Sequence, residues 1–266
     1  MIVEVRGVGL CAPGLPDWPT GHAVLTGRQP YAPNEPQRFD QVRLPRNAAR
    51  RASLTVRLAL QAATEALDAA GMDAVECSAV FACSGGNTEA LDALCQALIE
   101  PGLPISPNQF NNSVHNAPLG YWTIATGSRQ PTASVGAYDA SFAAGLLESV
   151  ALAAVEHHPV LLVAFDTPPP PALQPFRAVS VPFGVALLLT SEALPGGWVR
   201  LHDFKSCPLV REDREIAPLP ELERWLRSNP AAHSLPLLHR IANRQAGTVQ
   251  LPYLPGDRLK FQVTPC

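Results

Sequence analysis

Residues 132–146, Thr-Ala-Ser-Val-Gly-Ala-Tyr-Asp-Ala-Ser-Phe-Ala-Ala-Gly-Leu, join a short uncharged strand to the most apolar helix of the chain. The strand is predicted over 131–136. The helix is predicted over 139–156, and only Glu148 and Glu156 are charged within its body. A helix that is apolar over so many turns is expected to be buried nearly all round. The stretch therefore predicts a strand–turn–helix unit whose helix is buried.

Apolar segments elsewhere predict further strands, with helical segments between them. The strands are expected over 2–10, 77–83, 160–165 and 182–190, and the helices over 47–70, 88–99 and 115–126. Because helices alternate with apolar strands, the chain is predicted to be α/β, with a mostly parallel five-stranded sheet covered by helices. A proline-rich loop is predicted over 13–45.

The pattern changes after Pro195. A strand over 197–205, helices over 221–228 and 235–243, and a last strand over 259–263 are predicted beyond it. We therefore expect a main domain over residues 1–195 and a small C-terminal extension over residues 196–266.

Composition narrows the classes of function. Only 16% of residues are charged, against roughly 25% in an average soluble domain, and 47% are hydrophobic. Such a chain fits either a compact enzyme or a subunit that buries much of its surface against a permanent partner. The net charge of −3 gives no electrostatic case for binding nucleic acid. No uninterrupted apolar run approaches the ~20 residues of a membrane helix, and the first residues are unlike a signal peptide, so we expect a cytoplasmic protein without a membrane span.

Neither a metal nor a cofactor is predicted. The chain has six cysteines: Cys11, Cys77, Cys83, Cys95, Cys207 and Cys266. None of them stands in CxxC spacing, so a structural zinc site is not expected. Gly7 and Gly9 suggest part of a dinucleotide fingerprint, but the third glycine is out of place and a proline-rich loop stands where the helix should begin.

Two places in the chain are candidates for chemistry. Cys83 ends a strand before a glycine turn, where backbone N–H groups would hold an oxyanion, and with His115 it would form a Cys–His pair. The competing interpretation is a buried cysteine and a helix histidine that never meet. Asp139 begins the apolar helix, where it would be an ordinary N-cap. A cysteine at this helix start would have a lowered pKa, but none stands there.

Four segments together resemble the β-ketoacyl synthases of the thiolase superfamily. Residues 132–146 resemble the nucleophile elbow and its helix, and residues 160–166 resemble the strand after it. Residues 112–127, Asn-Ser-Val-His-Asn-Ala-Pro-Leu-Gly-Tyr-Trp-Thr-Ile-Ala-Thr-Gly, resemble the segment whose helix packs beneath the active site. Residues 63–71 are similar to the first long helix. Since the four segments stand in the family's order, the resemblance implies the N-terminal half of a ketosynthase.

The chain departs from the family at its reactive groups. The resemblance places Tyr138, or Asp139 with a slip of one residue, where ketosynthases carry the acyl-accepting cysteine. Ser141 and Phe142 complete the elbow. The second ketosynthase half, which supplies the catalytic histidines, has no counterpart here, because no His-Gly-Thr-like motif follows. No catalytic residue is therefore assigned.

The chain looks most like a chain length factor, particularly the truncated type of aryl polyene pathways. The resemblance implies a non-catalytic subunit that pairs with a full-length β-ketoacyl-ACP synthase in polyketide or fatty-acid-type elongation, and that meets acyl carrier protein through the complex. It implies pairing through one strand, formed by Thr132, Ala133, Ser134, Val135 and Gly136. Two alternatives stay open: an acyl-thioester hydrolase or acyltransferase with a nucleophile such as Cys83, and a homodimer that binds acyl carrier or lipid.

Overall fold

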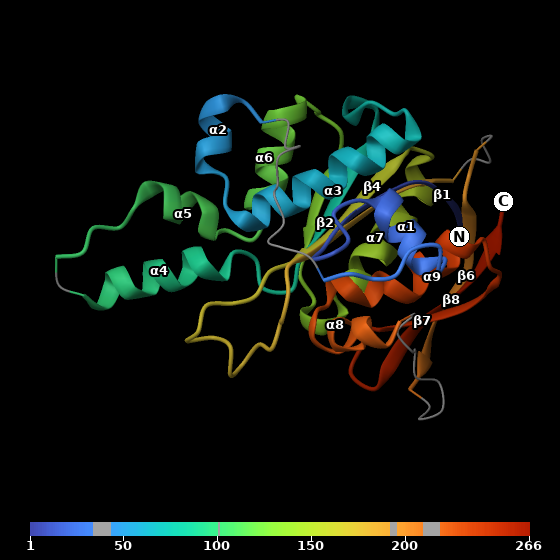
Figure 1. The fold of residues 1–266 in the computed structure, drawn as a ribbon. Coiled ribbons are helices and arrows are strands. Elements are labelled where there is room, and N and C mark those ends of the chain that lie inside the picture. The colour runs from blue at the N-terminus through green and yellow to red at the C-terminus, as the bar shows by residue number, and fades with distance from the viewer. Residues whose placement is uncertain (34–43, 101, 192–195, 210–218) are drawn as a thin grey trace.

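The computed structural model describes residues 1–33, 44–100, 102–191, 196–209 and 219–266 (Figure 1). Its centre is one sheet of eight strands in the order β3-β2-β4-β5-β1-β6-β8-β7. The strand bounds are β1 Ile2–Cys11, β2 Ser78–Ala82, β3 Thr132–Val135, β4 Val160–Asp166, β5 Phe183–Thr190, β6 Val199–Pro208, β7 Gly247–Pro252 and β8 Asp257–Pro265. Helices cover both faces of this sheet.

The α/β class predicted from the sequence is confirmed, but the sheet has eight strands rather than five, and it is mainly antiparallel. Among the described strands, β2 pairs in parallel with β3 and with β4, and the other pairs are antiparallel. Parallel neighbours need a long crossover, usually a helix. The loop 167–182 between β4 and β5 contains no helix, and β7 and β8 form a hairpin. Both connections therefore produce antiparallel pairs.

α3 (Leu54–Ala70) covers one face of the sheet and crosses β1 very closely. A Cβ added at Gly7 would overlap the backbone carbonyl oxygen of Ala66, and one added at Gly9 would overlap that of Ala62. Only glycine lets the helix and the strand approach this far. This contact accounts for the Gly7-x-Gly9 pattern without a bound dinucleotide.

α7 (Ser141–Glu156) covers the opposite face, together with η4 (Ala231–Ser234) and α9 (Leu235–Asn243). Eight of the sixteen residues of α7 are buried, and Val155 is 72% exposed near its end. The prediction of a helix buried nearly all round is therefore correct for the sheet-facing side only. The segment Tyr138–Glu156 is long and apolar enough to cross a membrane by length and composition alone, and half of it is buried inside the protein.

The helix predicted over 47–70 is divided in two. α2 (Arg46–Arg51) ends before Ala52, and α3 begins after Ser53. The Ser53 hydroxyl accepts a hydrogen bond from the Val56 N–H at 3.3 Å, so Ser53 is an N-cap inside the predicted helix.

The loop predicted over 13–45 contains a helix, α1 (Trp18–Leu25). The Asp17 side chain caps it by accepting from the Thr20 N–H at 2.8 Å. Residues 34–43 of that predicted loop lie outside the described residues. Residue 195, at the predicted domain boundary, also lies outside them, and the boundary stays a prediction.

The remaining helices are short. Their bounds are η1 Ala74–Glu76, α4 Thr88–Ile99, α5 Pro107–Ser113, α6 Ala117–Thr126, η2 Tyr138–Ala140, η3 Pro220–Leu222 and α8 Glu223–Ser228. The helix predicted over 235–243 is confirmed as α9, whereas the sequence does not predict β7. α4 and α5 project away from the sheet, at the left of Figure 1. We call this segment, residues 88–113, the arm.

Candidate functional site

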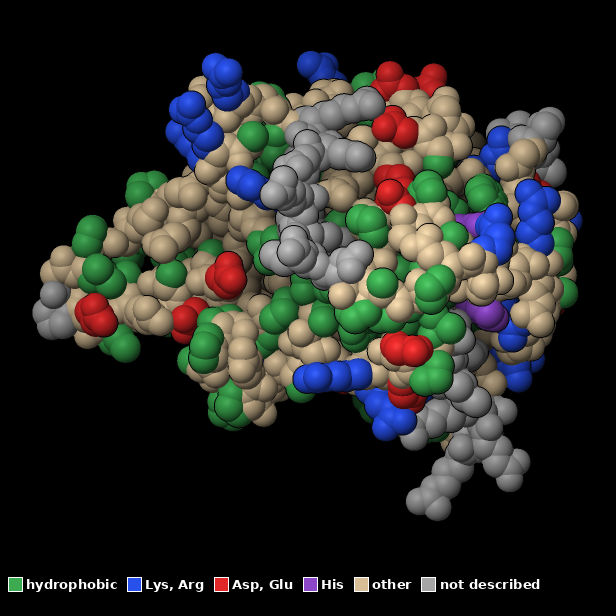
Figure 2. Space-filling model, in the orientation of Figure 1, with side chains coloured by type: hydrophobic (Ala, Val, Ile, Leu, Met, Phe, Trp, Pro, Cys, Tyr) green, Lys and Arg blue, Asp and Glu red, His purple; other side chains and the backbone are tan. Residues whose placement is uncertain are grey.

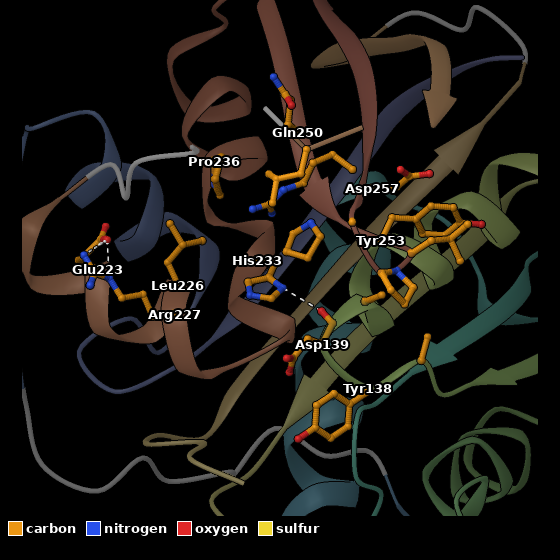
Figure 3. Close-up of a pocket in the computed structure, with 18 residues that line it drawn as sticks. Tyr138, Asp139, Glu223, Leu226, Arg227, His233, Pro236, Gln250, Tyr253 and Asp257 are labelled. Atoms are coloured by element: carbon orange, nitrogen blue, oxygen red, sulfur yellow. Dashed lines mark hydrogen bonds and ion pairs between the residues drawn. The ribbon is translucent and has the colours of Figure 1, made fainter. Parts of the chain in front are cut away.

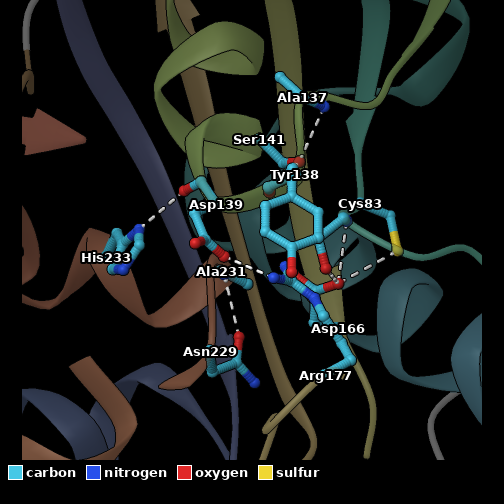
Figure 4. A network of polar contacts seen from close by, with 11 residues as sticks. Cys83, Ala137, Tyr138, Asp139, Ser141, Asp166, Arg177, Asn229, Ala231 and His233 are labelled. Carbon is cyan, nitrogen blue, oxygen red and sulfur yellow. Dashed lines mark hydrogen bonds and ion pairs between the residues drawn. The ribbon is translucent and has the colours of Figure 1, made fainter. Parts of the chain in front are cut away.

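Three parallel strands bring their C-terminal ends together. β2, β3 and β4 run in the same direction, so the segments that follow them lie side by side. Cys83 follows β2, Tyr138 follows β3, and Asp166 is the last residue of β4 (Figure 4). Open α/β sheets bind ligands beyond the carboxyl ends of their strands. This is therefore the place to look for a site.

Tyr138 stands at the tip of a sharp elbow. Its backbone has a φ of 51°, a left-handed conformation that is uncommon for a bulky residue and costs about 1–3 kcal/mol. Asp139 does not share this conformation. The Tyr138 side chain is 58% exposed, so the elbow presents it to the surroundings. The backbone thus makes a sharp left-handed turn and carries a tyrosine at its tip.

The Ser141 hydroxyl holds the elbow in shape. It accepts a hydrogen bond from the Ala137 N–H at 3.0 Å and donates one to the Tyr138 carbonyl at 2.7 Å (Figure 4). Ser141 is buried, and Phe142 beside it is buried in the core. These two predicted elbow residues therefore act through structure: one satisfies the backbone of the turn, and the other anchors the start of α7.

We expect Ser141→Ala to lower the free energy of unfolding by about 0.5–1.5 kcal/mol, because it leaves the part-buried N–H of Ala137 and the carbonyl of Tyr138 without their partner. Ser113→Ala is the matched control. The Ser113 hydroxyl donates only to the Phe110 carbonyl on an exposed part of the arm, so its loss should change stability by less than about 0.5 kcal/mol. Urea unfolding measures both. Equal stabilities of Ser141→Ala and the parent would show that the elbow does not depend on this hydroxyl.

Asp139 does not cap α7, so its interpretation as an N-cap is wrong. The N-cap position belongs to Ala140, which makes no side-chain hydrogen bond. The Asp139 carboxylate pairs instead with Arg177 at 2.5 Å. Its backbone carbonyl accepts from His233 Nδ1 at 3.0 Å. The Asp139 carboxylate, which the local sequence pattern predicted to cap the helix, therefore pairs with Arg177, 38 residues further along the chain.

Cys83 and His115 lie close together, but the histidine does not reach the thiol. His115 Nε2 lies 2.9 Å from the backbone carbonyl oxygen of Cys83, and Nδ1 lies 2.9 Å from the Ser134 hydroxyl. Since a carbonyl only accepts, Nε2 donates to it, and Nδ1 bonds to the Ser134 hydroxyl. His115 is therefore not placed as a base for Cys83. It links the end of β2 to β3.

The Cys83 thiol is enclosed in the protein and points at the Asp166 carboxylate, with 3.4 Å between Sγ and Oδ1. Burial, and then the Asp166 charge, raise the pKa of the Cys83 thiol well above its ordinary value. Burial also raises the pKa of Asp166, although Ser84 donates to its Oδ1 from the backbone at 2.9 Å and from the hydroxyl at 2.5 Å. A buried thiol that stays protonated is a poor nucleophile.

An open groove of about 640 Å³ runs beside the elbow (Figure 3). Residues 137–140 form one wall, residues 252–258 of the β7–β8 hairpin form another, and Leu226 and Arg227 of α8 complete it. Its volume is in the range of small-molecule sites. Burial lowers the pKa of His233, which lines the groove, so its ring is neutral. The described residues that line the groove include no cysteine.

The five residues predicted as an interface lie at the outer edge of the sheet. β3 is the first strand, and among the described strands it pairs with β2 alone. The carbonyls of Pro131 and Val135 accept hydrogen bonds from the β2 side. Because alternate residues of a strand direct their backbone groups to opposite sides, the N–H and carbonyl of Thr132 and Ser134 point away from β2. Gly136 follows the strand and leads into the elbow.

The sequence does not predict three residues of the site: Asp166, Arg177 and His233. The sequence contains one indication that Asp166 belongs to the site, because this charged residue directly follows the apolar run Val-Leu-Leu-Val-Ala-Phe. Arg177 lies in a proline-rich loop, and His233 stands 94 residues from Asp139, to which it donates. No local pattern connects either of them to the elbow.

Residues 26–248 match the family model described as β-ketoacyl synthase, N-terminal domain. The chain belongs to this family. The match extends over most of the chain, beyond the elbow and as far as β7. No curated protein matches the sequence.

Solved structures place this ketosynthase-family chain among similar folds. One is a chain from the ketosynthase ApeO in complex with its chain length factor ApeC from Xenorhabdus doucetiae, with a TM-score of 0.72 and 24% identity over 99% of both chains. The ishigamide ketosynthase/chain length factor has a TM-score of 0.75 and 12% identity over 100% of this chain and 99% of the other. The AntDE:AntF complex, a ketosynthase with its acyl-carrier protein, gives the same values. These likenesses concern the fold, which is thiolase-like from end to end.

Proposed function

We propose that this chain is a non-catalytic ketosynthase-like subunit, a chain length factor, that pairs with an active β-ketoacyl-ACP synthase in polyketide or fatty-acid-type elongation. The observation that carries the proposal is the elbow. Its left-handed backbone is intact, but Tyr138 occupies the tip where the family resemblance calls for an acyl-accepting cysteine. A fold that keeps the elbow and lacks the thiol fits a partner subunit better than an enzyme.

The remaining groups at the site support the same reading. Claisen condensation needs a thiolate to hold the acyl chain and donors or bases to stabilise the enolate. Cys83 is buried with a raised pKa, and His115 faces a carbonyl and a hydroxyl. His233 donates to the Asp139 backbone. None of these described side chains is free to play a part in condensation or in thioester hydrolysis.

The β3 edge supports the presence of a partner. An unpaired strand edge exposes backbone donors and acceptors that a second sheet can satisfy. The edge formed by Thr132 and Ser134 is short and uncharged, and the described part of the chain leaves it uncovered. We propose that this edge pairs with the matching strand of the ketosynthase, so that the two sheets become continuous.

The arm extends the same surface. It exposes large apolar side chains along both of its helices and the loop between them: Leu91, Leu98, Ile99, Leu103, Ile105, Phe110 and Val114 just after it. Figure 2 shows hydrophobic side chains over the arm at the left of the molecule. His115 follows the arm and bonds to Ser134, so the arm and the β3 edge are connected. An apolar surface of this kind is expected to be covered by another protein.

The printed descriptions of the similar structures agree with this proposal. Two of them name a ketosynthase together with a chain length factor, and a third includes an acyl-carrier protein. By analogy, this chain would meet acyl carrier protein through the complex and work in the cytoplasm. Its own contribution would be to complete the ketosynthase dimer and to shape the acyl site of its partner.

Co-expression tests the proposal. Expressed alone, the chain is expected to be poorly soluble or to form homo-oligomers, because the β3 edge and the arm stay uncovered. Expressed with a full-length ketosynthase from the same organism, it should elute as a stoichiometric heterodimer, measured by size-exclusion chromatography with light scattering.

A stable, soluble monomer that binds none of the co-expressed ketosynthases would contradict the proposal. The isolated chain should also be assayed for acyl-thioester hydrolysis and acyl transfer, with Cys83→Ala as the control. Turnover that disappears in Cys83→Ala would instead favour an acyl-thioester hydrolase or acyltransferase with Cys83 as its nucleophile.

A further inference from the structure

Arg177 lies over the elbow, although it comes from a distant loop. Its guanidinium carbon is 3.8 Å from the centre of the Tyr138 ring, and its Nη1 donates to the Asp139 carboxylate at 2.5 Å (Figure 4). Its side chain is only 16% exposed. An arginine that stacks on an aromatic ring and pairs with a carboxylate is held in one orientation.

Beneath this arginine lies the buried pair of Asp166 and Cys83. Figure 4 shows Asp166 between Cys83 and Arg177. Asp166 is 3% exposed, and its Oδ2 has no hydrogen-bond partner among the described residues. Burial raises the pKa of Asp166, and hydrogen bonds from Ser84 and Cys83, followed by the positive charge of Arg177, act in the opposite direction. A buried carboxylate of this kind depends on the nearest cation and on the exclusion of water.

The loop that carries Arg177 is fixed at both ends. Its first residue, Thr167, lies within hydrogen-bond distance of the Thr55 hydroxyl, at 3.3 Å. Further along, the Ser180 and Ser228 hydroxyls are 2.9 Å apart, and the Asn229 side chain donates to the Val181 carbonyl at 2.9 Å. The loop is therefore tied to α3 and to the end of α8.

We propose that Arg177 seals the elbow: loop 167–182 sets its guanidinium across the face of Tyr138 and shields the buried Asp166–Cys83 pair from solvent. On the proposed function, the subunit is then inactive for two separate reasons. The tip of the elbow has no thiol, and the Cys83 thiol near it is shielded. This contact is internal to the chain and does not depend on the proposed partner.

Alkylation of the cysteines tests whether Arg177 shields the Cys83 thiol. The full chain, alone or with its ketosynthase, is treated with iodoacetamide, and the labelling rate of each cysteine peptide is read by mass spectrometry. In Arg177→Ala we expect Cys83 to react about tenfold faster or more, through local opening. Cys11 and Cys77 are also buried and should keep their rates.

Two further variants sharpen the result. Asp139→Asn removes the carboxylate that pairs with Arg177. Because Asp139 is exposed, this variant should remain folded, and it should speed Cys83 labelling by a smaller factor than Arg177→Ala does. Arg227→Ala removes an arginine that lines the groove and pairs with Glu223, and it should change nothing. Unchanged Cys83 labelling in both Arg177→Ala and Asp139→Asn would overturn the proposal. So would equal acceleration at Cys11, Cys77 and Cys83, because that pattern reports general loosening.

Discussion

Ser134→Pro is expected to weaken association with the ketosynthase at least about a hundredfold, enough to remove the heterodimer from a size-exclusion profile. Proline lacks the backbone N–H and therefore removes a ladder hydrogen bond from a sheet, and a hundredfold weaker association corresponds to about 2.8 kcal/mol. The Ser134 N–H points away from β2, as the bonds of Pro131 and Val135 to the β2 side require. The substitution therefore removes a donor from the proposed interface and none from the ladder inside this chain.

Two control variants distinguish a defect at the β3 edge from unfolding of the chain. Ser134→Ala loses the hydroxyl that bonds to His115 but keeps the backbone N–H, so it should still form the complex. Ala133→Pro removes an N–H that faces β2, so it should unfold the edge of the sheet in the isolated chain as well. Isothermal titration or co-purification with the tagged ketosynthase measures each variant. A Ser134→Pro complex as tight as that of the parent would remove β3 from the interface.

The sequence predicts the parts of the fold that depend on local pattern. The strand–turn–helix unit of residues 132–146 is in the structure as predicted, because its uncharged strand and apolar helix leave few alternatives. The amphipathic helix over 235–243 is also found at the predicted residues. The number of strands was beyond such reasoning, because β6, β7 and β8 join the sheet by pairing with distant segments. A strand's local pattern does not identify its neighbour.

The site shows the same division between local and distant contacts. A turn at Tyr138 or Asp139 could be predicted, since it is set by its own neighbours in the chain, and the left-handed backbone is found at Tyr138. The role of Asp139 could not, because Arg177 competes with the helix N-terminus for its carboxylate. The Cys83–His115 pair looked possible from spacing alone. The structure brings the two residues together through a backbone carbonyl, a contact that side-chain types do not encode.

Tyr138→Cys should restore a reactive thiol and should not restore condensation. The new cysteine would stand at the tip of the elbow, before α7 and beside the Arg177 guanidinium, which lies 3.8 Å from the present ring. A helix N-terminus and a nearby cation both lower a thiol pKa, so the variant should be labelled readily by an electrophilic acyl mimic. Cys95, exposed on the arm, is the internal reference for an ordinary thiol.

Condensation should not follow that labelling, because a thiolate is one member of a catalytic unit whose members are strongly non-additive. His115 and His233 are the described histidines nearest the elbow, and each is committed to a backbone carbonyl. The decisive assay pairs Tyr138→Cys with a ketosynthase whose own cysteine is replaced by alanine, and measures carrier-bound product by mass spectrometry. We expect elongation to stay at the background of the complex that lacks both cysteines, whereas the parent chain with an intact ketosynthase elongates normally. Clear elongation by the Tyr138→Cys complex would mean that a working site survives in this chain, and that its partner role rests on the loss of a single side chain.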